Sequence, residues 1–121
     1  MAVATRNTRT SIAAATTVTA GTPSNGTSFD MRTAISGTAL GTIINGGTGP
    51  TISAQFCVQM STDNATWVDI FRASAGTAAS TTYPFAFVLP PDTAYHRVVI
   101  DSNTGQNVTG YGVIEETTSI G

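Results

Sequence analysis

Apolar and polar residues alternate without a break along residues 51–60, TISAQFCVQM. One face of this segment carries Ile52, Ala54, Phe56, Val58 and Met60. The other face carries Ser53, Gln55, Cys57 and Gln59. A period of two is typical of a strand that buries one face, so this segment is predicted to be a strand whose apolar side lines a core.

Similar short apolar runs recur about every 8–12 residues, between connections rich in Gly, Pro, Asn and Asp. They predict further strands at 13–20, 28–36, 38–45, 66–73, 81–89, 94–102 and 108–116. Residues 1–12 show no such pattern and are expected to form a flexible N-terminal arm. We therefore expect a single all-β domain over 13–121, an antiparallel β-sandwich of seven to eight strands.

The predicted strand at 66–73 carries the chain's single Trp, and both of its faces contain apolar side chains. Burying an unpaired carboxylate is costly, so the face with Asp69 is expected to point outward, and Val68 and Ile70 inward. The outer surface would then combine Gln55, Cys57, Gln59, Trp67, Asp69 and Phe71. Such a mixture of aromatic and amide side chains is typical of a contact with a protein or a sugar. The alternative is that Trp67 folds over the edge of the core and caps it.

The composition implies a surface that is poor in charge. Charged residues make up 10% of the chain, against about 25% in an ordinary soluble protein. All five basic residues are Arg, and Thr is roughly one residue in five, which favours strands. Lysines normally protect exposed strand edges, so their absence suggests that neighbouring molecules cover much of this surface. A Thr-rich monomer of low charge is the alternative.

Several classes of partner are disfavoured. The net charge is −2 and no basic cluster occurs, which argues against nucleic acid. No apolar run reaches the about 20 residues of a membrane span. The start of the chain lacks the continuous apolar stretch of a signal peptide. Cys57 is the only cysteine, which excludes an internal disulfide framework.

No group of residues has the pattern of an active site. His96 lies within a predicted strand, where a His is usually structural or at the surface. Cys57 has no predicted electropositive surroundings that would activate its thiol. Glu115 and Glu116 are adjacent in a strand, so their side chains point to opposite faces and cannot act as a pair. We therefore expect no enzyme activity, no metal and no cofactor.

Residues 87–100, FVLPPDTAYHRVVI, resemble the corner between strands E and F of immunoglobulin-like and fibronectin type III-like sandwiches. The residues that carry the resemblance are Pro90, Pro91, Asp92 and Tyr95. It implies that the Tyr95 hydroxyl bonds back to the upstream backbone and locks the turn. It also implies that four strands share one sheet, namely those at 51–60, 66–73, 94–102 and 108–116. A jelly roll with a similar Pro-Pro turn is the competing fold.

The patterns SxDNxTWxxI at 61–70 and FxLPPxTxYxRVxxxxNTGQxVT at 87–109 are similar to small structural proteins of tailed-phage virions. The resemblance implies a homo-oligomeric virion component that is synthesised in the host cytoplasm and binds other virion proteins. The first expectation is a capsid decoration or cement protein that stabilises the head shell through symmetric contacts. Arg6 and Arg9 in the arm would dock on acidic capsid surface; an ordinary disordered terminus is the alternative.

Two other functions remain open from the sequence. One is a ring component of the phage neck or tail, which would be physically similar. The other is a carbohydrate-binding module, in which Trp67 and Phe71 stack on a surface glycan while Gln55 and Gln59 bind its hydroxyl groups.

Overall fold

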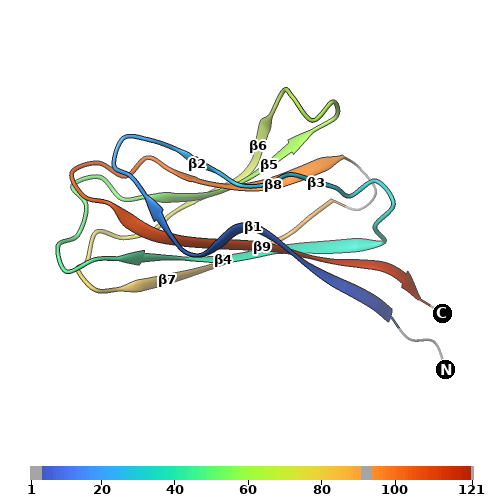
Figure 1. Ribbon diagram of the computed structural model, residues 1–121, viewed down its shortest axis with the longest axis horizontal. Coiled ribbons are helices and arrows are strands. Elements are labelled where there is room, and N and C mark those ends of the chain that lie inside the picture. The colour runs from blue at the N-terminus through green and yellow to red at the C-terminus, as the bar shows by residue number, and fades with distance from the viewer. Residues whose placement is uncertain (1–3, 91–93, 121) are drawn as a thin grey trace.

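Antiparallel strands in two facing sheets make up the computed structural model, which describes residues 4–90 and 94–120 (Figure 1). The strands are β1 (Ala4–Val18), β2 (Ser24–Asn25), β3 (Phe29–Asp30), β4 (Ser36–Asn45), β5 (Gln55–Ser61), β6 (Val68–Ser74), β7 (Thr82–Val88), β8 (Tyr95–Asp101) and β9 (Val108–Ile120). Sheet A has the order β1-β9-β4-β7, and sheet B has the order β2-β8-β5-β6, with β3 also paired to β8. The prediction of an all-β antiparallel sandwich is confirmed. The described residues contain no helix that could span a membrane.

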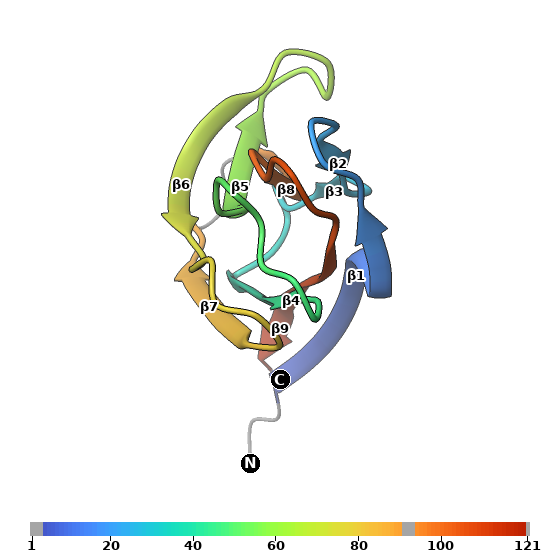
Figure 2. The ribbon, with the colours of Figure 1, turned by 90° about the vertical axis from the view of Figure 1, so that its left-hand side faces the viewer.

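The strands pair in a nested way. The first strand pairs with the last, and the pairs β2·β8, β4·β7 and β5·β6 follow inward along the chain. A long hairpin rolled up in this way gives the Greek keys of a jelly roll. Figure 2 shows the rolled sheets along the length of the sandwich. The immunoglobulin-like arrangement is wrong, because β9 lies in sheet A between β1 and β4 instead of beside β8.

A buried asparagine helps to explain why the chain changes sheet after β8. The side chain of Asn103 is fully buried, and its Nδ2 donates to the carbonyl oxygens of Val18 (3.1 Å) and Gln106 (3.0 Å). The bond to Val18 ties the connection to the end of β1, so β9 continues beside β1. The turn residues at 102–107 fit a simple hairpin equally well, so the local sequence does not distinguish the two arrangements, whereas long-range bonds such as this one do.

The core lies between the sheets and is built from alternate residues of the strands. Phe56 of β5 is fully buried, and its ring stacks on that of Phe85 of β7, with centroids 5.0 Å apart. Gly41 of β4 makes room for this ring, because a Cβ at that position would lie 2.4 Å from Phe56 Cε2. Val58 is also fully buried, as predicted. Ile52, which was expected to point inward, is 57% exposed because it precedes β5.

The segment expected to be a flexible arm is different in the structure. From Ala4 onward it belongs to β1, which pairs with β9 from Ala4–Ile120 to Val18–Val108. In Figure 1 the two paired strands run on beyond the end of the sandwich. Residues 1–3 lie outside the described part of the chain. The structure thus corrects the arm to a paired strand over residues 4–12.

Polar contacts hold the inner face of this strand. Arg9 Nε donates to a carboxylate oxygen of Glu116 (2.6 Å), whose side chain is almost fully buried. The Ser11 hydroxyl donates to the Thr27 carbonyl (2.8 Å) and accepts from the Val98 N–H (2.9 Å). Alternation of apolar residues cannot reveal a strand whose inward positions are polar, and for this reason the sequence pattern missed it.

The middle of β1 is irregular, with a register shift between Ile12 and Thr16. Ala15 lies there with a φ of 60°, a left-handed conformation that costs a residue with a Cβ about 1–2 kcal/mol. We expect Ala15→Gly to raise the free energy of unfolding by about 0.5–1 kcal/mol, because relief of this strain outweighs the added entropy of the unfolded chain. Urea unfolding followed by Trp fluorescence measures the change. Ala14→Gly should instead lower stability, and an equal loss in both variants would contradict the strain.

Candidate functional site

The outer face of sheet B presents a polar surface built by β5, β6 and β8. Five of the six residues predicted for one outer contact surface come together here: Gln55, Cys57, Gln59, Trp67 and Asp69. Arg72 of β6 and Arg97 and Asp101 of β8 complete the cluster. We refer to these eight residues as the Trp67 surface.

Arg72 forms the centre of a hydrogen-bonded network on this surface. Its Nη1 donates to Asp101 Oδ1 (2.6 Å) and to Gln55 Oε1 (2.7 Å), while Nη2 donates to Asp69 Oδ2 (2.9 Å). The side chain therefore links β5, β6 and β8 across the sheet. Hydrogen bonds to Asp101 and Asp69 raise the pKa of Arg72 above its ordinary value, so the guanidinium at the centre of the network stays charged.

Cys57 is held as an unreactive thiol. Its Sγ donates to Asp69 Oδ1 (3.2 Å), which also accepts from Gln59 Nε2 (2.8 Å). Burial, and to a lesser extent this carboxylate, raise the pKa of Cys57 to about 12. The hydrogen bond from Gln59 is the main cause that holds the pKa of Asp69 below its ordinary value. Since the thiolate is the nucleophile, Cys57 offers no reactive group near neutral pH.

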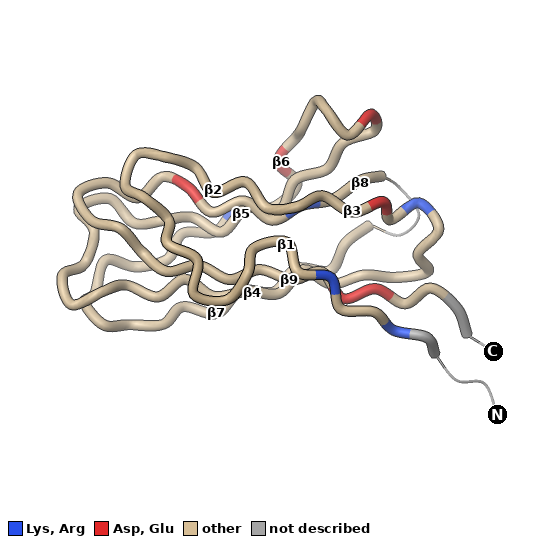
Figure 3. The backbone as a smooth tube through the Cα atoms, in the orientation of Figure 1, with Lys and Arg blue, Asp and Glu red and all other residues tan. Residues whose placement is uncertain are grey.

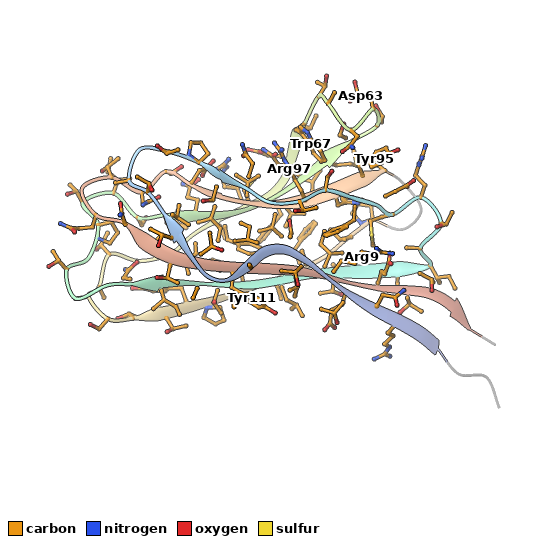
Figure 4. The ribbon with its side chains drawn as sticks, viewed as in Figure 1. Arg9, Asp63, Trp67, Tyr95, Arg97 and Tyr111 are labelled. Atoms are coloured by element: carbon orange, nitrogen blue, oxygen red, sulfur yellow. The ribbon has the colours of Figure 1, made fainter. Side chains whose placement is uncertain are left out.

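Trp67 lies on the outer side of sheet B, near the base of the hairpin that joins β5 and β6 (Figure 4). The Arg97 guanidinium lies over its ring, 4.3 Å from the centroid, and Arg97 Nε donates to Gln59 Oε1 (2.8 Å). The indole is half-buried by these contacts, and a cation–π contact of this kind is stabilising. Trp67 is thus an ordered part of an outer surface and does not fill the core between the sheets.

Phe71 is the predicted contact residue that the structure places elsewhere. The register between β5 and β6 shifts after Val58, and Ile70 is the extra residue of the resulting bulge. An extra residue reverses the facing of those that follow it. Phe71 consequently points inward and stacks on Phe87, with ring centroids 4.8 Å apart, so its predicted outward orientation is wrong. Val68, expected to point inward, is 58% exposed because the hairpin projects from the sandwich.

Tyr95 contacts Arg32, which lies just after β3. Its hydroxyl accepts a hydrogen bond from Arg32 Nη2 (3.1 Å), and the Arg32 guanidinium lies 4.9 Å from the centroid of its ring. Arg32 also binds Asp30 and thereby lowers the pKa of that carboxyl to about 2. Tyr95 therefore joins a second polar cluster next to β3. The other predicted corner residues are Pro90, which is exposed, and Pro91 and Asp92, which lie outside the described residues.

The two arginines expected to contact a capsid have different surroundings. Arg9 is paired with the buried Glu116, and its guanidinium lies 5.7 Å from the centroid of the Phe29 ring. It therefore serves the fold of this chain. Arg6 is exposed in the first part of β1, opposite Thr117 of β9, where an external partner can reach it.

The arrangement of side chains on sheet B favours contact with a partner. His96 is fully buried, so it is structural and does not lie at the surface. Within residues 4–90 and 94–120, no three His, Cys, Asp or Glu side chains are grouped closely enough to hold a metal ion. The Trp67 surface combines a pre-ordered aromatic ring with paired charges, which are the elements of a binding surface.

A second surface, the outer face of sheet A, was not predicted. The sequence carried a signal for it, because no charged residue occurs between Arg32 and Asp63 or between Arg72 and Asp92. These two stretches contain β4 and β7, which lie side by side in sheet A. Pairing them requires the tertiary fold, so neither stretch alone reveals the uncharged face.

The sequence matches no known protein family and no curated protein. In contrast, the fold is similar to solved capsid structures of infectious bursal disease virus. The chain from the Gx strain has a TM-score of 0.60 and 16% identity over 94% of this chain. The chains from the T13 particle and from the VP2 subviral particle have TM-scores of 0.58 and 0.55, each with 13% identity over 94% of this chain. This chain spans only about a third (31–32%) of those viral chains, and at such identity the likeness shows a shared fold.

Proposed function

We propose that this chain is a non-enzymatic structural protein of a tailed-phage virion that decorates and stabilises the head shell. The observation that carries the proposal is the similarity of its jelly roll to virus capsid structures along 94% of the chain. The sequence patterns at 61–70 and 87–109 support the phage setting. A sequence identity of 13–16% to the viral chains indicates a shared fold and nothing about function. The proposal therefore also depends on a surface through which the chain could attach to a shell.

The Trp67 surface is suited to such attachment. Trp is among the residues that contribute most to protein interfaces, especially when its ring is held in place. Arg97 and Gln59 already fix the indole, so binding would immobilise little additional side-chain freedom. The hairpin between β5 and β6 projects from the sandwich and can reach into a junction between shell subunits (Figure 1). Many weak contacts of this kind add up on a symmetric shell.

The geometry disfavours the carbohydrate-binding alternative. Its platform required Trp67 and Phe71 on one face, but Phe71 points into the core. In addition, the Arg97 guanidinium occupies one face of the Trp67 ring. A single ring with one open face is a poor stacking platform for a sugar. A neck or tail ring component would use the same surface and differs only in its place on the particle.

We expect Trp67→Ala to reduce attachment to the particle at least about tenfold, because it removes the central aromatic contact. The fold should lose only about 1 kcal/mol, the scale of the contact with Arg97, and not the about 3–5 kcal/mol of a core aromatic. Tagged variants produced during infection can be quantified by immunoblot in purified particles. Thr66→Ala, an exposed neighbour, serves as the matched control. Equal incorporation of Trp67→Ala and the unsubstituted chain would contradict the proposed surface.

Electron microscopy with gold-labelled antibody gives the position on the particle. Regular labelling over the head is the result expected for a decoration protein. Labelling confined to the neck or the tail would replace this assignment by the ring component. Particles free of label would overturn the proposal of a virion protein.

A further inference from the structure

The outer face of sheet A is almost entirely uncharged. The pairing of β4 with β7 and β9 places threonines and apolar side chains on this face, among them Leu40, Ile44, Ala86, Val88 and Tyr111. Val88 is 73% exposed and Ile44 is 40% exposed. We call this surface the sheet A face. Exposed apolar side chains gathered on one side of a sheet usually mark an interaction site.

The charges of sheet A are confined to one end. β4 and β7 contain no charged residue, and those of β1 and β9 are Arg6, Arg9, Glu115 and Glu116. Figure 3 shows the charges of β1 and β9 gathered toward the end of the molecule at which the termini lie, and Glu115 and Glu116 there still pair with β4. By contrast, the Trp67 surface on the opposite side carries two arginines and two aspartates. The two broad faces of the molecule therefore suit different partners.

The sheet A face also contains a depression. A shallow depression of about 310 Å³ lies between the irregular part of β1 and the middle of the sheet. It is lined mainly by apolar groups, including Ala14, Ala15, Ile44 and Tyr111. A protruding apolar side chain such as Val88 is small enough to enter a hollow of this size.

We infer that the sheet A face binds the same face of a second copy of this chain. Over most of this face a charged partner would lose hydration without gaining an ion pair, because the outward charges Arg6 and Glu115 lie at one end of it. The partner must therefore be uncharged over the same area, and the chain's own sheet A face meets that requirement. Two sheets can pack face to face about 10 Å apart with their side chains interdigitated. A two-fold axis through the face would bring each protruding residue against its partner's surface.

The area of the face is sufficient for a stable pair. Sheet A is four strands wide, which at about 4.8 Å per strand gives about 19 Å. The 10 residues of β4, at about 3.4 Å each, give a length of about 34 Å. Two such faces in contact would bury roughly 1,300 Å² in total, within the about 1,200–2,000 Å² of standard interfaces.

This pairing deepens the proposed function and rests on it for its biological setting. The Trp67 surface lies on sheet B, so a dimer joined through sheet A carries two Trp67 surfaces that face away from each other. One dimer could then contact two subunits or two neighbouring capsomers at once. Such bivalent contact multiplies the strength of each single attachment.

The test is the solution mass of the purified chain by light scattering over a wide range of concentration. We expect the unsubstituted chain to form a dimer. Val88→Lys and Ile44→Lys should each raise the dissociation constant at least about tenfold, because they place a charge within the contact. Val68→Lys and Ile52→Lys are matched controls, since these side chains are 58% and 57% exposed away from the sheet A face. All four positions are exposed, so unfolding midpoints can verify that each variant folds.

A strictly monomeric chain would overturn the inference and would mean that a different molecule covers the face. A dimer that Val88→Lys and Ile44→Lys leave intact would overturn it as well, because another surface would then be responsible. The outcome is separable from that of the proposed function. If the chain forms a dimer but is never found in particles, the sheet A pairing stands and the virion role is wrong. If the chain is a monomer but is found on heads, the virion role stands and the pairing is wrong.

Discussion

Phe56→Ala is expected to lower the free energy of unfolding by about 3–5 kcal/mol, as large buried aromatics do when truncated. Phe56 is fully buried, and its ring lies nearly parallel to Phe85, with an interplanar angle of 3°. The stack joins β5 of sheet B to β7 of sheet A, so its loss removes a contact between the two layers. Gly41 faces the same ring and has no side chain that could move into the cavity.

Urea unfolding followed by Trp67 fluorescence measures this loss. Cys57→Ala is the matched control, because Cys57 is the next residue of the same strand and points to the outer face. That variant removes only a small side chain and one hydrogen bond to Asp69, so we expect a cost of about 1 kcal/mol. Equal costs for the two variants would contradict a core centred on the phenyl ring.

Acid is expected to destabilise the protein through His96. This side chain is fully buried, and burial, which outweighs a backbone contact at Ala94, lowers its pKa below the ordinary 6.5. In the unfolded chain His96 would take up a proton as the pH falls through about 6.5, whereas in the folded protein it stays neutral. The unfolded state therefore binds more protons below that pH, and stability decreases as the solution becomes more acidic.

Thermal unfolding at a series of pH values between neutral and mildly acidic conditions detects this effect. Asp30 and Asp63 do not obscure it, because their pKa values are lowered to about 2 and they titrate only in stronger acid. His96→Leu, which removes the titrating group and keeps the position apolar, should flatten the pH dependence in this window. A variant with the same acid sensitivity as the parent chain would show that another group is responsible.

The sequence predicted individual strands well wherever one face is apolar. The expected strands at 38–45, 81–89 and 94–102 closely match β4, β7 and β8. It could not predict that the first strand pairs with the last, because the inward side chains there include Arg9 and buried Glu116, which look like surface residues. The immunoglobulin-like assignment failed for a related reason. A short corner motif carries no information on which sheet the following strand joins.

The candidate surface was predictable to the extent that alternation holds. Asp69 correctly indicated the outer face of β6, and its hydrogen bonds to Gln59 and Cys57 account for this placement. The error arose at Phe71, two residues after Asp69, because the extra residue Ile70 between them reverses the alternation of the two faces. Nothing in the local sequence marks that bulge. It follows from the need to bury Phe71 against Phe87 while Asp69 remains solvated.

The nested pairing of strands also sets the order in which this chain can fold. The β5–β6 hairpin brings together neighbouring segments, and hairpins of this kind form within about 1–10 μs. Each later pair closes a longer loop, and the outermost contacts, such as Arg9 with Glu116, join residues 107 positions apart. Contacts so distant in sequence slow folding. We therefore expect the chain to fold from its middle outward, so that the uncharged face of sheet A is complete only once the last strand has left the ribosome.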